Sequence, residues 1–228
     1  MKYALTTILS ISFFFNICFA AEKPELKDQK DKESYSLGYQ FGQSVKHQGL
    51  DIKLELYTSG IRDALSGSKP QLSQEEMQQT ISELQKRFIA AREKEIKEIS
   101  ARNLAEGKAF LEENKKKEGI KTLPSGLQYK VLTEGSGKTP KAADNVTVNY
   151  KGTFINGSEF DSSYKRGKPT TFQVDKVVKG WTEALQLMKE GSKWELFIPP
   201  ELGYGDRGGG PVPPNSTLIF EVELISVK

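Results

Sequence analysis

Apolar residues in the first half of the chain recur at the spacing of α-helices. Leu37, Phe41 and Val45 follow one another every four residues beside Gly38 and Gly42, so they form one apolar stripe with a shallow groove where another backbone can approach closely. Between residue 33 and about residue 117 the chain has a single proline, which favours helix throughout. A second helix is expected over residues 54–65, with one apolar face made by Leu54, Tyr57, Ile61 and Leu65.

A third helix has a clear start and a surface that changes along its length. Ser73 and Glu76 have the spacing of a capping box, and Leu72 and Met77 have that of the hydrophobic staple around it. Nothing in the sequence breaks this helix before about residue 117. Its first half carries an apolar seam for partner helices, made by Met77, Ile81, Leu84, Phe88 and Ala91. Beyond this seam charged residues dominate, which predicts a solvated bridge between domains.

The helical half is expected to form a homodimer. Helices of this modest length, in a small domain without a disulfide or a metal, bury little surface in a monomer. Self-association of residues 33–91 into a symmetric dimer would cover their apolar stripes. We therefore interpret residues 21–72 as an N-terminal helical dimerisation domain and residues 73–118 as a long connecting helix. The alternative is a monomeric helical bundle with a frayed tail.

The pattern changes after Gly119 to short runs in which apolar and polar residues alternate. Gly, Pro, Asn and Asp separate these runs, which is typical of an antiparallel sheet. One helical segment interrupts them over residues 180–191, with Trp181, Leu185 and Met188 on a shared face. We predict an α+β domain over residues 119–228, in which an antiparallel sheet of five to six strands wraps on one short helix. The expected strands are LQYKVL, NVTVNYKGTF, TTFQV, KWELFI and TLIFEVELISV.

The connection over residues 199–215 concentrates conformational extremes. Its sequence, PPELGYGDRGGGPVPPN, holds five of the ten prolines of the chain and five glycines. Gly203 and Gly205 would allow a tight turn around Tyr204, while the prolines stiffen the returning segment. A large aromatic residue with a polar tip has little structural reason to lie in such a loop unless something binds there. The loop is therefore expected to form one wall of a small apolar pocket.

The chain begins with the features of a secretory signal peptide. A short basic start, MKY, precedes an uncharged apolar stretch, and a densely charged segment follows. We predict a signal peptide over residues 1–20, with Cys18-Phe19-Ala20 before the cleavage site. An uncleaved anchor is the alternative, although the apolar centre is short for a membrane span. A lipoprotein modified at Cys18 is disfavoured by Ile17. The protein is thus expected to be exported to the periplasm, the outer membrane or the cell surface.

The inventory of reactive side chains excludes several classes of function. Cys18 is the only cysteine and His47 the only histidine, so neither the usual zinc sites nor a Ser-His or Cys-His pair can be assembled. Charges are balanced in both halves, with 18 Lys+Arg against 18 Asp+Glu over residues 21–118 and 14 against 12 over residues 119–228. Nucleic-acid binders carry a concentrated basic surface. We therefore expect no metal, no cofactor and no nucleic-acid partner.

Several motifs in fixed order carry a family resemblance. VNYKGTF is followed by SEFDSSYKRGKP, by VVKGWTEALQLMKEGSKWELFIPPELGYG and by VPPNSTLIFEVELISV. This series resembles the FKBP-type peptidyl-prolyl cis-trans isomerases and covers residues 119–228. The signal peptide, the helical half and the long connecting helix resemble the exported dimeric members of that family, the macrophage infectivity potentiator and periplasmic foldase group.

The resemblance implies an isomerase that acts on proline-containing unfolded or exported proteins, with chaperone activity from the dimeric helical domain. It implies Asp161 and Tyr204 as catalytic residues, with Arg166 steadying Asp161. It also implies binding of rapamycin-type macrolides and a role in virulence. The implied substrate pocket has the indole of Trp181 as its floor, and its walls are Tyr150, Phe160, Val177, Val178, Tyr204, Val212 and Phe220.

Plainer readings of these residues stay open. Phe160, Val178 and Phe220 are also suited to the core of any sheet, and Trp181 to anchoring a helix. Asp161, followed by two serines, fits a turn with local capping. Thr170 stands where many family members have an aromatic residue, so the pocket rim is expected to be wider. An alternative function is therefore an FKBP-like binding or virulence module with little catalytic turnover.

Overall fold

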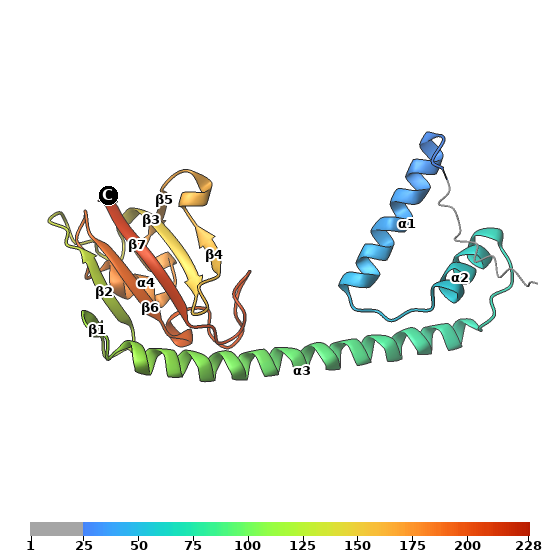
Figure 1. Ribbon diagram of the computed structural model, residues 1–228, viewed down its shortest axis with the longest axis horizontal. Helices are drawn as coiled ribbons and strands as arrows, with labels where there is room; N and C mark the ends of the chain where they lie inside the picture. The colour runs from blue at the N-terminus through green and yellow to red at the C-terminus, as the bar shows by residue number, and fades with distance from the viewer. Residues whose placement is uncertain (1–24) are drawn as a thin grey trace, which may run out of the picture. The chain divides into compact units, whose positions relative to one another are not determined.

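The computed structural model describes residues 25–228 (Figure 1). The predicted signal peptide over residues 1–20 lies outside the described residues. The chain divides into two compact units, one that ends at Ser73 and one that spans Gln74–Lys228. Each unit is described by itself.

The N-terminal unit contains two helices. Helix α1 spans Gln29–His47 and begins with a capping box, in which the Asp31 backbone N–H donates to the Asp28 carboxylate at 2.8 Å and the Asp31 carboxylate accepts from the Asp28 N–H. This cap explains why α1 begins earlier than residue 33. Helix α2 spans Leu54–Ser66 and ends at Gly67 in the left-handed conformation. The two helices meet where the rings of Phe41 and Tyr57 stack with centroids 4.8 Å apart.

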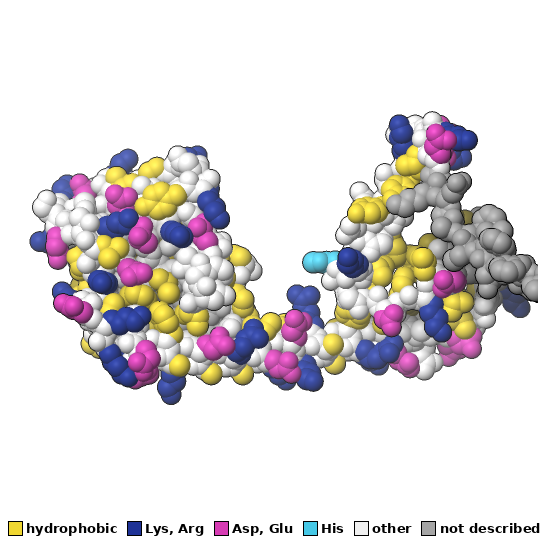
Figure 2. Space-filling view, in the orientation of Figure 1, with side chains coloured by type: hydrophobic (Ala, Val, Ile, Leu, Met, Phe, Trp, Pro, Cys, Tyr) yellow, Lys and Arg dark blue, Asp and Glu magenta, His cyan; other side chains and the backbone are white. Residues whose placement is uncertain are grey.

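Both helices of this unit present apolar side chains to solvent. In the part of the chain that the structure describes, no residue of α1 or α2 is buried. Leu37 is 69% exposed and Leu65 is 85% exposed. Figure 2 shows hydrophobic side chains spread along the surface of both helices. Contiguous exposed apolar surface of this kind marks an interaction site.

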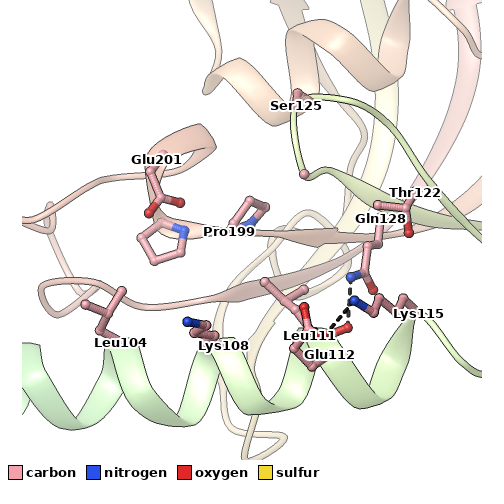
Figure 3. Close-up of a pocket in the computed structure, with 12 residues that line it drawn as sticks. Leu104, Lys108, Leu111, Glu112, Lys115, Thr122, Ser125, Gln128, Pro199 and Glu201 are labelled. Carbon is pink, nitrogen blue, oxygen red and sulfur yellow. Dashed lines mark hydrogen bonds and ion pairs between the residues drawn. The ribbon is translucent and has the colours of Figure 1, made fainter.

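Helix α3 spans Gln74–Asn114, so it is 41 residues long, or about 61 Å. It ends three residues before the expected position. The predicted solvated bridge is wrong for the last part of the helix, because Gly107 and Asn114 are buried against the sheet domain. The Gln128 side chain donates to the Leu111 carbonyl at 2.9 Å (Figure 3). It also accepts from the Asn114 side-chain amide at 3.0 Å. The end of α3 is therefore part of the C-terminal fold.

The C-terminal fold is an antiparallel sheet that wraps on helix α4 (Figure 1). The strand order is β1-β2-β6-β7-β3-β4, and β5 also pairs with β3. Helix α4 spans Lys179–Leu185. Short 3-10 turns η1 (Tyr164–Arg166), η2 (Val174–Lys176) and η3 (Pro200–Leu202) connect these elements. The strands are β1 (Ile120–Thr122), β2 (Gln128–Thr133), β3 (Asn145–Phe154), β4 (Glu159–Ser162), β5 (Thr170–Gln173), β6 (Lys193–Ile198) and β7 (Leu218–Val227).

The core lies between the concave face of the sheet and α4. On β3 the side chains of Val146, Val148 and Tyr150 alternate with more exposed neighbours, as expected for a strand with one buried face. They meet Trp181 and Leu185 from α4 in one apolar cluster. This packing holds the start of α4 against the middle of the longest strands, where the candidate site is built.

The structure confirms an α+β fold with an antiparallel sheet and corrects its strand count. The sheet of the described chain has seven strands rather than five to six. The two additional strands, β1 and β4, have three and four residues, which is too short for alternation to be recognised in sequence. Within residues 25–228, no helix is both long and apolar enough to cross a bilayer.

Candidate active site

A cavity of about 410 Å³ opens beside the start of α4. The side chains that line it come from four strands (β3, β4, β5 and β7), from η2 and α4, and from the loops that follow η2 and η3. Most of the lining is aromatic or aliphatic. The cavity is lined by Tyr150, Phe160, Asp161, Phe172, Lys176, Val177, Val178, Trp181, Tyr204 and Phe220.

Trp181 forms the rigid part of this cavity. Its side chain is almost fully buried, with 4% of its surface exposed. Three rings pack against the indole at near-perpendicular angles, with centroids 5.2 Å away for Tyr150, 5.3 Å for Phe220 and 5.9 Å for Phe172. Edge-to-face pairs of this kind are favourable and fix ring orientation. The indole N–H is buried and donates to no group of the described chain.

Tyr204 lies on the other side of the cavity, in the loop that follows η3. The residue is 42% exposed, and its hydroxyl makes no hydrogen bond to residues 25–228. Gly205 has a positive φ of 64°, as the tight turn requires, whereas Gly203 does not adopt a left-handed conformation. A side chain at Gly209 would reach within 2.8 Å of the Tyr204 ring. The backbone at Gly209 thus packs against the Tyr204 ring, while the hydroxyl of Tyr204 is free to bond a ligand.

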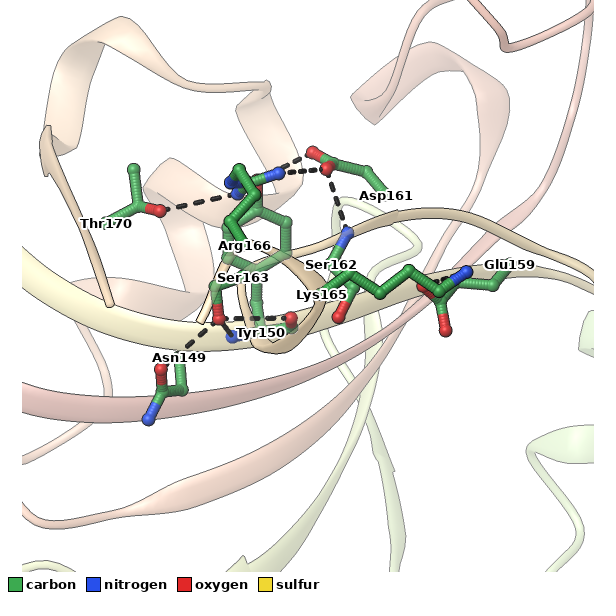
Figure 4. Close-up of polar contacts among 9 residues, drawn as sticks. All are labelled: Asn149, Tyr150, Glu159, Asp161, Ser162, Ser163, Lys165, Arg166 and Thr170. Atoms are coloured by element: carbon green, nitrogen blue, oxygen red, sulfur yellow. Dashed lines mark hydrogen bonds and ion pairs between the residues drawn. The ribbon is translucent and has the colours of Figure 1, made fainter. Parts of the chain in front are cut away.

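The polar part of the site is a closed network around Asp161 (Figure 4). One carboxylate oxygen accepts from Arg166 at 2.5 Å and from the Ser162 backbone N–H at 2.8 Å. The other oxygen accepts from the Tyr150 hydroxyl at 2.6 Å. Arg166 also donates to that hydroxyl at 2.7 Å and to Thr170 at 3.3 Å. Both oxygens of Asp161 are therefore occupied by donors from the protein itself.

The network shifts the ionisation of its members in opposite directions. Partial burial alone would raise the pKa of Asp161, but hydrogen bonds from Tyr150 and Arg166 outweigh burial and lower that pKa below its ordinary value. Burial and the bond to Asp161 raise the pKa of the Tyr150 hydroxyl. The pKa of Arg166 is raised by its hydrogen bonds to Asp161 and Tyr150. At neutral pH the site thus holds an ionised carboxylate, a neutral phenol and a guanidinium.

The structure brings together most of the residues that the sequence singled out, and separates two of them from the cavity. Arg166 contacts Asp161 and Tyr150 but is not part of the lining. Val212 is buried in the core and pairs with Gly209, so its side chain does not line the cavity. The eight residues placed on the lining are Tyr150, Phe160, Asp161, Val177, Val178, Trp181, Tyr204 and Phe220.

Two residues that line the cavity, Phe172 and Lys176, were not predicted from the sequence. Phe172 lies in the run TTFQV, where it reads as an ordinary strand residue, and its ring reaches Trp181 only because β5 pairs with β3. Lys176 is a charged residue in a polar turn, and no local pattern distinguishes it. No group of metal-ligating side chains was found among residues 25–228.

Comparison with known proteins identifies the family. The family model of the FKBP-type peptidyl-prolyl cis-trans isomerases matches residues 136–225, and that of the domain amino terminal to FKBP-type peptidyl-prolyl isomerase matches residues 30–131. The chain is 47% identical over 230 residues to Outer membrane protein MIP of Legionella longbeachae, across 100% of this chain and 99% of the relative. The chain belongs to the FKBP-type peptidyl-prolyl cis-trans isomerases.

Two further comparisons agree with this assignment. The FKBP-type chain is 43% identical over 229 residues to peptidyl-prolyl cis-trans isomerase Mip of Coxiella burnetii, across 100% of this chain and 99% of the relative. The crystal structure of FkpA from Escherichia coli superposes with a TM-score of 0.70 at 41% identity, and covers 90% of this chain and 99% of that chain. The resemblance seen in the sequence is confirmed, and the protein is a peptidyl-prolyl cis-trans isomerase of the FKBP type.

Proposed function

We propose that the Trp181 cavity is the active site, and that it speeds X-Pro rotation by holding the twisted amide in a water-poor aromatic environment. Rotation must cross a barrier of roughly 18–20 kcal/mol, but it breaks no covalent bond. The site must therefore bind the twisted form better than the planar forms. A planar amide is more dipolar and better hydrated than a twisted one, so a dry aromatic cavity favours the twist.

One observation carries this proposal. The buried indole of Trp181 and the free hydroxyl of Tyr204 line the same cavity. The indole offers a flat apolar support for a proline ring, and the hydroxyl can donate to a substrate carbonyl. Phe160 and Phe220, whose ring centroids are 5.4 Å apart at near-perpendicular planes, would form a side wall with Val177 and Val178.

Asp161 has an electrostatic role in this proposal. Its lowered pKa and its occupied oxygens make it a poor proton donor at neutral pH. A fixed negative charge beside the cavity instead favours the positive end of the rotating carbonyl group. Arg166 holds this charge in place from outside the lining, and Tyr150 links the network to the aromatic floor.

The test is peptide turnover by the Tyr204→Phe and Asp161→Ala variants. Loss of one hydrogen bond in the transition state lowers kcat/KM by about five- to tenfold, so Tyr204→Phe should show this loss on a short Ala-Leu-Pro-Phe peptide. Tyr129→Phe is the matched control, because Tyr129 stacks on Trp194 at 4.4 Å outside the cavity. Full activity of both site variants would contradict the proposed site.

We also propose that α1 and α2 form a homodimer and that the dimer assists client folding. The support is the exposed apolar surface of these helices, where Leu37 and Phe41 are 69% and 44% exposed. A second copy of the chain would cover it. Two linked catalytic domains raise the effective concentration of sites along one unfolded client. The name of the Legionella relative and the apolar start of the chain support export to the periplasm or the outer membrane.

The dimer proposal is tested by adding charge to the stripe. The double variant Leu37→Glu/Phe41→Glu should have half the mass of the parent in solution, keep short-peptide turnover and lose activity in proline-limited refolding of a protein. Ser36→Glu/Gln40→Glu is the control, because it adds the same two charges at the same spacing at exposed polar positions of α1. A dimer that survives the double variant, or equal losses on peptide and protein, would contradict the division of labour.

The cavity is also proposed to bind rapamycin-type macrolides. Its aromatic lining around Trp181 would quench or shift the indole fluorescence on binding. A titration of a Trp194→Phe variant isolates this signal, and protease-coupled turnover measured in parallel separates an enzyme from a binding module with little turnover. Macrolide binding that leaves peptide turnover unaffected would place the ligand elsewhere.

A further inference from the structure

The loop that carries Tyr204 is tied to helix α3 through Asn215. Asn215 has a φ of 53° and is the one non-glycine residue with positive φ among residues 25–228. Asparagine tolerates this conformation better than most residues. Its side-chain amide donates to the Ser100 hydroxyl of α3 at 2.8 Å. Its backbone N–H donates to the Gly205 carbonyl at 2.9 Å, immediately after Tyr204.

A second residue of α3 holds the same segment. Asn103 donates from its side-chain amide to the Pro214 carbonyl at 2.8 Å and to the Ser216 hydroxyl at 3.4 Å. Ser216 in turn donates to the Pro213 carbonyl at 2.8 Å. Ser100 and Asn103 are three residues apart and lie on one face of the helix. Helix α3 is therefore hydrogen-bonded to the end of the loop at two positions, Ser100 and Asn103.

The other end of the loop is fixed to the sheet domain. The Gly205 N–H donates to the Pro200 carbonyl of η3 at 2.9 Å, so Gly205 is held on both sides. Gly209 exchanges two hydrogen bonds of 2.9 Å with Val212, and its backbone lies against the Tyr204 ring. The glycines of this loop are intrinsically permissive, so these bonds restrict a segment that would otherwise sample many conformations.

We propose that Asn215, held by Ser100, is a positioning residue that keeps the Tyr204 hydroxyl in place for catalysis. The inference rests on the proposed role of Tyr204. The connecting helix would then contribute directly to turnover, because it immobilises the turn from which the phenol projects. Small displacements of a group that contacts the transition state are costly in rate. A looser turn would leave the cavity intact and weaken one hydrogen bond within it.

The experiment measures kcat/KM of the full chain on a short prolyl peptide. Ser100→Ala and Asn215→Gly each remove the same bond, from the helix and from the loop, and glycine keeps the positive φ. Each should lower kcat/KM about three- to fivefold. Asn215→Asp should restore most of the activity, since the Ser100 hydroxyl can donate to the new carboxylate. Ser82→Ala is the matched control, on the exposed surface of α3 away from the loop.

The decisive readout is a double-mutant cycle with Tyr204→Phe. If the Asn215–Ser100 hydrogen bond acts through the Tyr204 hydroxyl, Ser100→Ala and Asn215→Gly should lower kcat/KM less than about 1.5-fold in the Tyr204→Phe background. A general loss of folded enzyme would instead lower activity equally in both backgrounds, and that result would overturn the inference. Thermal unfolding of each variant shows directly whether the folded fraction has changed.

The outcomes separate this inference from the proposed function. Suppose that Tyr204→Phe has reduced activity while Ser100→Ala and Asn215→Gly keep full activity. This result would overturn the positioning role of Asn215 and would leave the proposed active site unchanged. Unchanged activity of Tyr204→Phe would overturn the role of Tyr204 itself, and the positioning role would fall with it. If Asn215→Gly does not fold, the kcat/KM of Ser100→Ala in the two Tyr204 backgrounds tests the positioning role by itself, because this variant leaves the loop sequence intact.

Discussion

Gly107→Ala tests whether the end of α3 is packed on the sheet domain. In an exposed helix interior this substitution stabilises by about 1 kcal/mol, because alanine has the higher helix propensity. The structure predicts the opposite sign here. A Cβ at Gly107 would collide with the Thr217 hydroxyl and would lie 3.1 Å from the Thr217 Cβ. Thr217 is 3% exposed and β-branched, so it cannot move aside easily.

Overpacking of a buried contact costs typically about 1–3 kcal/mol. After the gain in helix propensity of about 1 kcal/mol is subtracted, Gly107→Ala should lower the free energy of unfolding by up to about 2 kcal/mol. Urea unfolding followed by tryptophan fluorescence measures this change, since both tryptophans lie in the domain that α3 contacts. The same substitution in a Thr217→Ala background should cost clearly less, because the colliding hydroxyl is gone.

A Thr217→Val background separates the effect of the size of the Thr217 side chain from that of its hydroxyl group. The Thr217 hydroxyl is buried without a hydrogen-bond partner in the described chain, so Thr217→Val should be neutral or stabilising. Because valine keeps the volume of threonine, Gly107→Ala should remain destabilising in that background. A stabilising effect of Gly107→Ala in the parent protein would refute the reasoning, because it would mean that this face of α3 is solvated.

Four further predictions concern the cavity and the network around Asp161. Lys176→Glu should reverse a preference of about two- to threefold for peptides with Glu rather than Lys before proline, and this preference should fade in high salt, since the lysine is exposed. Phe172→Leu should lower kcat/KM several-fold by loosening Trp181, as checked by peptide turnover. Turnover should not titrate between about pH 5 and 8, because the pKa of Asp161 is lowered and that of Tyr150 is raised. The stability from ionised Asp161 should be present above its ordinary pKa and be lost as pH falls through its lowered value. Asp161→Asn lacks this pH-dependent contribution, so at matched neutral stability its acid unfolding, followed by tryptophan fluorescence, should begin at a more acid pH than that of the parent.

Local patterns predicted most of the secondary structure because each element is specified by residues close in sequence. The spacing of Leu37, Phe41 and Val45 predicted α1, and alternation predicted the long strands β3 and β7. The ordered motifs from residue 148 to residue 227 predicted the family and eight residues of the cavity lining. Short elements escaped, since three or four residues cannot display a period.

The role of the connecting helix was visible only in three dimensions. The region after Ala91 reads as a charged, solvated surface, yet Gly107 is buried and Asn103 reaches Pro214, 111 residues away in sequence. A polar side chain on a helix gives no sign in sequence of whether it meets water or a distant carbonyl. The same reasoning explains Phe172 and Lys176, which reach the cavity through the pairing of β5 and the placement of η2.

The amino-acid sequence by itself determined the helices, the alternating strands and the set of aromatic residues that an isomerase pocket needs, because these depend on periodicity and on motifs within short stretches. The tertiary structure decided which of those residues share a cavity, that Arg166 and Val212 are not part of its lining, and that α3 is hydrogen-bonded to the Tyr204 loop. These features arise from contacts between residues up to 115 positions apart, and such contacts follow from packing of the whole domain rather than from any local pattern.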